Sequence, residues 1–171
     1  MRKSQLLVRL QNEREDWEHA LNFVGSIRLG IGGVSGHWSA RDILAHIMAR
    51  EQHLADRLHE LQQGESLPPC QTQDELDTFL EEFGYPDFES PLLAEADADE
   101  WVVRKYRNTP FQELLVLEIH AFEAIHESIQ ALSEEQLNEN KLFARVKRAT
   151  YEHYRLHAAD IHKRFKTAVK R

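Results

Sequence analysis

The stretch WSARDILAHI, residues 38–47, decides the fold, because a polar start leads directly into an amphipathic helical pattern. Ser39 and Asp42 have the spacing of a capping box, with Asp in place of the usual Glu or Gln. Apolar residues then recur at helical spacing until Gly64. This apolar stripe consists of Ile43, Ile47, Leu54, Leu58 and Leu61. We therefore expect a helix from Ser39 to just before Gly64, with His46 on the flank of its stripe.

Three other long segments predict helices with one apolar stripe each. The first covers residues 4–27, with Leu6, Leu10, Trp17, Leu21 and Val24 on the stripe. The next begins at TPFQ, residues 109–112, where threonine predicts the N-cap and proline the first helical position. Its stripe consists of Phe111, Leu114, Leu115, Phe122, Ile125, Ile129 and Leu132. The last begins near Thr150 and carries Tyr154, Ala158, Ile161 and Phe165 inward.

The connections carry weaker signals. Thr72 and Glu75 predict a short capped helix that reaches about Phe83. Residues 84–99 are acidic, contain two prolines and predict a long surface loop, and residues 99–107 predict one or two helical turns. A short connecting helix is expected after Ser133. Nothing in the chain has the pattern of a run of β-strands.

Amphipathic helices of this length bury their stripes best against one another. We therefore predict an all-α fold, a four-helix bundle with a long elaborated connection between its second and third helices. With 171 residues, the chain fits a single domain over residues 1–171.

Composition excludes several classes of protein. A net charge of −8 argues against nucleic-acid binding, which needs a basic face. A single cysteine, Cys70, permits no internal disulfide and excludes a cysteine-based zinc site. No stretch is apolar enough for a signal peptide or a membrane span, so we expect a cytoplasmic protein.

Histidines are the candidate metal ligands. His153 and His157 are four residues apart, and this spacing places them one turn apart on the same side of a helix. Together with His46 from another helix they would offer three nitrogens and leave a fourth position open, as in catalytic zinc sites. The alternative is that all three are ordinary boundary histidines. His53 lies two turns beyond His46 on the same face and could be a further ligand or an outer partner.

Two carboxylates and a phenol are candidate catalytic groups. Glu118 lies near the centre of an apolar stripe, where a bare charge is too costly, so it must be paired, hydrogen-bonded or protonated. It is either a structural ion pair or hydrogen-bond partner, or a general acid/base or a carboxylate that orients a histidine. Glu51 poses the same question at the edge of its stripe. Tyr151 could hold its hydroxyl near the site.

These motifs resemble the DinB-like superfamily, and within it the DfsB, or DUF1706, group that contains the colibactin self-resistance protein. The resemblance is carried by residues 38–47, by NTPFQE at 108–113, by LSEEQL at 132–137 and by TYEHYxxHxxxI at 150–161. It covers most of the chain, from about residue 4 to residue 165. The order and spacing of the motifs make it more specific than any one of them.

The resemblance implies a four-helix bundle that is often a homodimer. It also implies a Zn²⁺ or Ni²⁺ ion held by His46, His153 and His157. Some relatives are thiol-dependent transferases or isomerases that use mycothiol or bacillithiol. The self-resistance branch is linked instead to opening a reactive cyclopropane in a genotoxin, without a metal.

Three functions follow as hypotheses. The first is a metal-dependent hydrolase or transferase that binds a small molecule in a histidine-lined cleft, with Glu118 or Glu51 as acid/base. The second is a metal-free hydrolase or sequestering protein that protects against a reactive small molecule. The third is a non-catalytic bundle that binds a ligand or dimerises. Metal content separates the first hypothesis from the other two.

Overall fold

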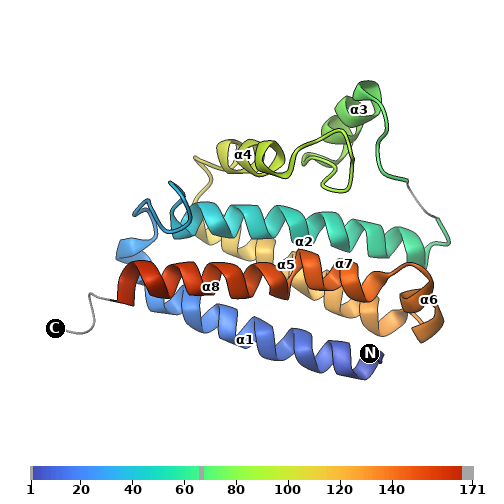
Figure 1. Cartoon of the computed structure of the whole chain (residues 1–171), viewed down its shortest axis with the longest axis horizontal. Helices are drawn as coiled ribbons and strands as arrows, with labels where there is room; N and C mark the ends of the chain where they lie inside the picture. The colour runs from blue at the N-terminus through green and yellow to red at the C-terminus, as the bar shows by residue number, and fades with distance from the viewer. Residues whose placement is uncertain (1, 66–67, 167–171) are drawn as a thin grey trace.

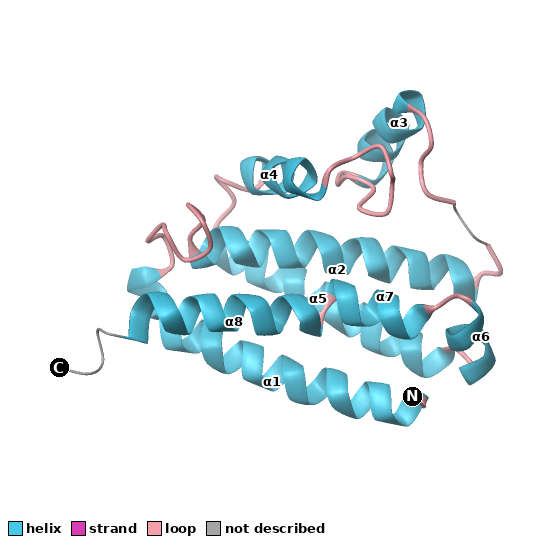
Figure 2. Cartoon of the chain, viewed as in Figure 1, coloured by secondary structure: helices cyan, strands magenta, loops and turns pink. Residues whose placement is uncertain are grey.

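Helices and loops make up the fold, as the computed structural model describes it for residues 2–65 and 68–166 (Figure 2). The helices are α1 (Lys3–Arg28), α2 (Ala40–Gln62), α3 (Gln73–Phe83), α4 (Glu95–Lys105), α5 (Phe111–Ala131), α6 (Glu134–Glu139), α7 (Leu142–Ala149) and α8 (Tyr151–Phe165). Within these residues no strand forms, and the predicted all-α class is confirmed.

The long helices lie side by side (Figure 1). α2 packs along α5, and α1 packs along α8. The chain crosses back over the outside of α2 through α3 and α4, so α5 starts at the same end of the molecule as α2 and runs parallel to it. α7 and α8 follow one another along a single line, interrupted at Thr150. This interruption lies three residues before the first histidine of the candidate metal site.

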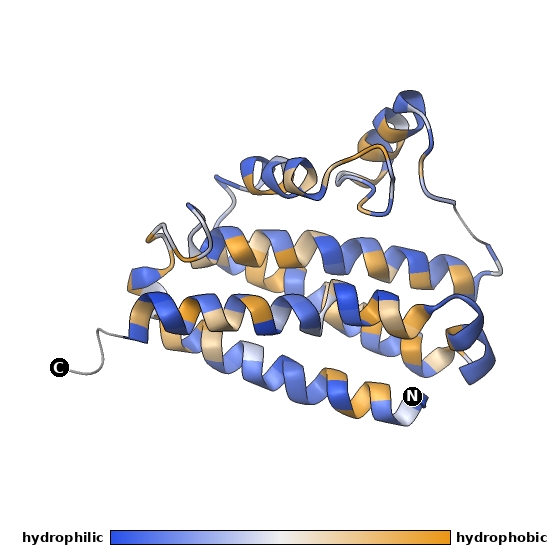
Figure 3. Cartoon of the chain, viewed as in Figure 1, coloured by the Kyte–Doolittle hydropathy of each residue, from blue (hydrophilic) through white to orange (hydrophobic). Residues whose placement is uncertain are grey.

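The core lies between these helices. Each long helix alternates hydrophobic and hydrophilic residues along its length (Figure 3), and the apolar ones meet inside. Burying a large apolar side chain contributes about 1.5–3 kcal/mol, so this core is the main source of stability. The largest fully buried side chains include Leu6, Leu10, Trp17, Ile43, Leu44, Ile47, Leu58, Leu114, Ile125, Ile129, Leu132 and Tyr154. A second, smaller cluster of Cys70, Leu76, Phe79 and Tyr85 holds α3 in place.

Three of the predicted helix starts are confirmed in detail. Both hydrogen bonds of a capping box form at Ser39, at Thr72 and at Ser133. The predicted threonine cap at Thr109 is wrong, since the helix begins one residue later with Pro110 as its N-cap and no side-chain cap bond.

Three segments differ from the prediction. α4 begins at Glu95, within the stretch expected to be a loop. Alanine and glutamate are good helix formers, and acidic side chains are favourable at a helix N-terminus, so residues 94–100 (AEADADE) extend the helix backward. α7 was not predicted as a separate helix. Finally, α1 is broken at Gly25, whose φ of 73° favours glycine.

None of the described helices is both long and apolar enough to span a membrane.

Candidate metal centre

His46 is held by a well-anchored helix. The α2 start is fixed by Asp42 N–H donating to Ser39 Oγ and by Ser39 N–H donating to the Asp42 carboxylate, at 3.2 and 3.0 Å. His46 follows two turns later and is buried. The indole of Trp38 lies beside its imidazole, with ring centroids 5.3 Å apart.

α8 supplies the other two histidines. The helix begins at Tyr151, directly after the break at Thr150, so His153 lies in its first turn and His157 one turn on. Nε2 of His46 lies 3.4 Å from Nδ1 of His153. One ring nitrogen from each of the three histidines can be chosen so that all lie within 4.8 Å of one another. The structure thus brings the three predicted ligands together, close enough to hold a metal ion.

Carboxylates contact the outer nitrogens of two of these rings. Asp99 Oδ1 lies 3.0 Å from Nδ1 of His46, and Asp160 Oδ2 lies 3.3 Å from Nδ1 of His157. Two ring nitrogens, Nδ1 of His46 and Nε2 of His157, are buried and make no hydrogen bond among the described residues, so the Asp99 contact with His46 is close but is not aligned as a hydrogen bond. Metal-binding histidines commonly use one nitrogen for the ion and the other for a carboxylate, so this pattern fits a metal site.

Burial also keeps two of the rings neutral. Burial, together with a smaller effect of the nearby His46, lowers the pKa of His153 to about 3 and that of His157 to about 4. Neutral imidazole is the form that binds a metal. Burial alone would raise the pKa of Asp99, but its contacts with His46 and Arg50 outweigh this and lower it. Two neutral imidazoles with an ionised carboxylate nearby suit a divalent cation.

Glu118 and Glu51 lie in a separate, fully buried polar cluster. Glu118 forms a two-pronged ion pair with Arg14 of α1, with Arg14 Nη2 2.6 Å from Glu118 Oε1 and a second, shorter contact through Nη1. Glu51 accepts a hydrogen bond from the hydroxyl of Tyr154. Within the described residues neither carboxylate hydrogen-bonds to a histidine of the cluster, and their catalytic roles stay predictions.

Tyr151 faces α1. Its ring is buried, and the guanidinium groups of Arg9 and Arg155 lie over it at 5.2 and 5.5 Å from the ring centroid. Its role at the site also stays a prediction. His53 is paired with Asp87, with Nε2 and Oδ1 3.0 Å apart, and is not one of the three clustered histidines.

Two residues of these clusters were not predicted. Arg14 occupies a core position, since it is four residues from Leu10 and three from Trp17 on the same stripe. That signal was available, and it would have suggested a partner for Glu118. Asp99 gave no comparable signal, because its contact with His46 depends on how the connection folds back over α2.

Comparisons with protein-family models, curated proteins and solved structures found no match to this chain. The resemblance to the DinB-like superfamily therefore stays a prediction.

Proposed function

We propose that this protein is a metal-dependent hydrolase or thiol transferase of the DinB-like type that acts on a small molecule at its histidine cluster. The observation that carries the proposal is the convergence of His46, His153 and His157 from two helices, with ring nitrogens within 4.8 Å of one another. Their order and spacing along the chain also match the ligand set that the resemblance implies.

The donor set favours Zn²⁺ or Ni²⁺. Imidazole nitrogen suits both ions, and three ligands leave one position open for a water or a substrate atom. When bound, such an ion lowers the pKa of a water or thiol at that position and makes it a nucleophile near neutral pH. The chain's own part is to orient the rings, through the Asp99 contact to His46 and the Asp160 contact to His157.

The proposal also assigns the helices of this chain to the parts of a DinB-like bundle. α1, α2, α5 and the α7–α8 line would be the four helices of a DinB-like bundle, and α3 and α4 its elaborated connection. The homodimer and the cytoplasmic location stay predictions. A sedimentation mass of one chain would contradict the homodimer.

Metal content tests the function most directly. Untagged protein purified without chelator is analysed by elemental mass spectrometry, beside a His153→Ala, His157→Ala variant. A His19→Ala, His120→Ala variant is the matched control, because both of these histidines are exposed and outside the cluster. We expect about one zinc or nickel per chain in the wild type and the control, as for a site with three protein ligands, and none in the cluster variant.

Absence of metal in the wild type, even after Zn²⁺ and Ni²⁺ are added, would overturn the proposal. It would favour the metal-free protective or binding role. Equal metal content in the cluster variant and the wild type would also overturn it, since the ion would then lie elsewhere.

A further inference from the structure

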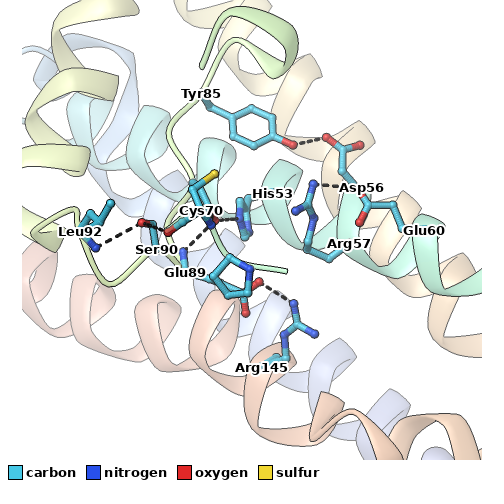
Figure 4. A network of polar contacts seen from close by, with 12 residues as sticks. His53, Asp56, Arg57, Glu60, Cys70, Tyr85, Glu89, Ser90, Leu92 and Arg145 are labelled. Atoms are coloured by element: carbon cyan, nitrogen blue, oxygen red, sulfur yellow. Dashed lines mark hydrogen bonds and ion pairs between the residues drawn. The ribbon is translucent and has the colours of Figure 1, made fainter. Parts of the chain in front are cut away.

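A groove of about 680 Å³ opens between α2, the connection that leads into α4, and α7. We call it the α7 groove. Figure 4 shows its surroundings, with Arg145 of α7 reaching toward Glu89 of the connection and His53 lying on α2. Sites for small molecules are commonly clefts of about 300–1,000 Å³, so the α7 groove has the size of a ligand site.

The groove begins four residues from the histidine cluster on α2 and on the interrupted α7–α8 line. Arg50, which lines it, is four residues after His46 on α2, and Ala149 is four residues before His153. Arg50 Nη2 lies 3.1 Å from the same Asp99 oxygen that contacts His46. A molecule in the groove would therefore have one end close to the histidines.

Basic side chains dominate the charged lining. Arg50, Lys141, Arg145 and Arg148 face two lining acids, Glu89 and Glu95. The chain as a whole carries a net charge of −8, so a locally basic groove is the reverse of what composition predicts. It gives the groove a positive potential that attracts an anion.

Three of these four cations are already paired with acids, and Arg50 Nη2 lies 3.1 Å from Asp99 and 3.7 Å from Glu95. Arg145 Nη2 lies 2.5 Å from Glu89, and Arg148 Nη2 lies 2.6 Å from Glu95. The Nε of Arg145 is nevertheless buried without a hydrogen-bond partner, and Lys141 has no ion pair in the part of the chain that the structure describes. The ammonium group of Lys141 is thus available to an additional oxyanion, and a ligand that displaced Glu89 would reach the guanidinium of Arg145.

The remaining wall is apolar. Leu54, Phe88, Leu93 and Ala144 line the groove between its charged groups. An apolar wall with a few convergent polar groups is the usual composition of a small-molecule site. It fits a ligand with an apolar body and one charged end.

We propose that the α7 groove binds a small amphipathic anion, an apolar molecule that ends in a carboxylate or a similar oxyanion. The anion pairs with Arg145 and Arg148 and takes the place of Glu89. Its apolar body lies against the apolar wall of Leu54, Phe88, Leu93 and Ala144. This names the substrate class for the proposed function and rests on it only for the reaction, since binding depends on the groove alone.

Isothermal titration calorimetry with octanoate, and with octanamide as its neutral counterpart, tests the proposal. We expect octanoate to bind the wild type about tenfold more tightly or better, because a charge-assisted pair with arginine is stronger than a neutral hydrogen bond. An Arg145→Gln, Arg148→Gln variant should lose that difference. The matched control is Arg104→Gln, Arg107→Gln, on exposed arginines outside the groove.

Glu89→Gln separates anion binding from a merely structural ion pair. It removes the carboxylate that competes for Arg145, so octanoate should bind several-fold more tightly than to the wild type. Unchanged or weaker binding would overturn the proposal, and this variant decides the matter if the double arginine variant does not fold. No octanoate binding by the wild type, or equal binding of octanoate and octanamide, would overturn it as well.

The His153→Ala, His157→Ala variant distinguishes this proposal from the proposed function. It should bind octanoate as the wild type does, because neither histidine lines the α7 groove. Octanoate binding in a protein that holds no metal would leave the groove standing and remove the metal-dependent reaction. A protein that holds the metal but binds octanoate and octanamide equally would remove the anion groove and leave the metal-dependent reaction standing.

Discussion

Asp99 of α4 contacts His46 of α2, with Oδ1 3.0 Å from Nδ1. The same oxygen lies 3.1 Å from Nη2 of Arg50. The helix that begins inside the expected loop is therefore the element that orients the α2 ligand of the candidate metal centre. Asp99 is a positioning residue, since it acts through the imidazole.

Asp99→Asn should weaken Zn²⁺ binding by about 10- to 100-fold, because the carboxylate fixes the tautomer and the basicity of the histidine. Competition with a chromophoric chelator measures the affinity. Asp97→Asn, an exposed residue on the same helix, is the control and should leave it unchanged. Equal affinities for the two variants would contradict the assigned role of Asp99.

Glu118→Gln should destabilise the protein by about 3–5 kcal/mol, because Arg14 would lose its two-pronged buried partner and keep only the exposed Glu18 and the more distant Glu51. Both groups are almost completely buried. The double variant Arg14→Met, Glu118→Leu should recover most of this loss, since apolar residues of similar size replace the pair. Urea unfolding at pH 7 measures both. A double variant no more stable than Glu118→Gln alone would contradict this account.

Much of the fold could be predicted because its signals are local. The caps at Ser39, Thr72 and Ser133 depend on residues three positions apart, and each is confirmed. The start of α4 was missed because no capping residue marks it, since Ala94 makes no side-chain cap bond. Helix propensity and the acidic first turn decide that boundary, and both are weak signals.

The candidate site was predictable only in part, for a related reason. His153 and His157 share a helix face by spacing, and the structure places His46 beside them. The contacts that surround this cluster join elements far apart in the chain. Asp99 approaches from the connection, and Arg14 reaches Glu118 from α1. The sequence pattern of a single segment does not show which distant residue its side chains will contact.

Asp87 should make stability depend on pH. Burial alone would raise its pKa, but contacts with His53 and with the N–H groups of Cys70 and Glu89 outweigh this and hold it below the ordinary value of 3.8. The stabilisation is therefore present above about pH 4 and is lost as pH falls through the lower folded-state pKa.

Asp87→Asn should accordingly cost about 1–3 kcal/mol at pH 7, through lost charge-assisted hydrogen bonds, with a smaller cost at pH 3. Urea unfolding at both pH values measures this. The control Asp16→Asn removes an exposed carboxylate and should change little. A cost that is constant between pH 7 and pH 3 would show that ionisation of Asp87 is not involved.

The pKa of Glu51 is shifted in the opposite direction to that of Asp87, so its contribution to stability has the opposite pH dependence. Its burial, with the nearby charge of Glu118, raises its pKa well above 4.5, against the smaller opposing effects of Arg14 and the Tyr154 hydroxyl. Glu51 therefore keeps its proton to a higher pH in the folded protein than in the unfolded chain. Folding takes up a proton, and this contribution to stability declines as pH rises above the unfolded-state value.

Glu51→Gln keeps the shape and removes this proton uptake. We expect the variant to match the wild type near pH 4 and to exceed its stability at pH 8, with the difference growing by at most about 1.4 kcal/mol per pH unit. Urea unfolding across this range measures it, and Glu118→Gln provides the contrast because it should destabilise at pH 8. A Glu51→Gln variant less stable than the wild type at pH 8 would mean that Glu51 is ionised in the fold. The buried cluster would then hold two charged carboxylates against one arginine.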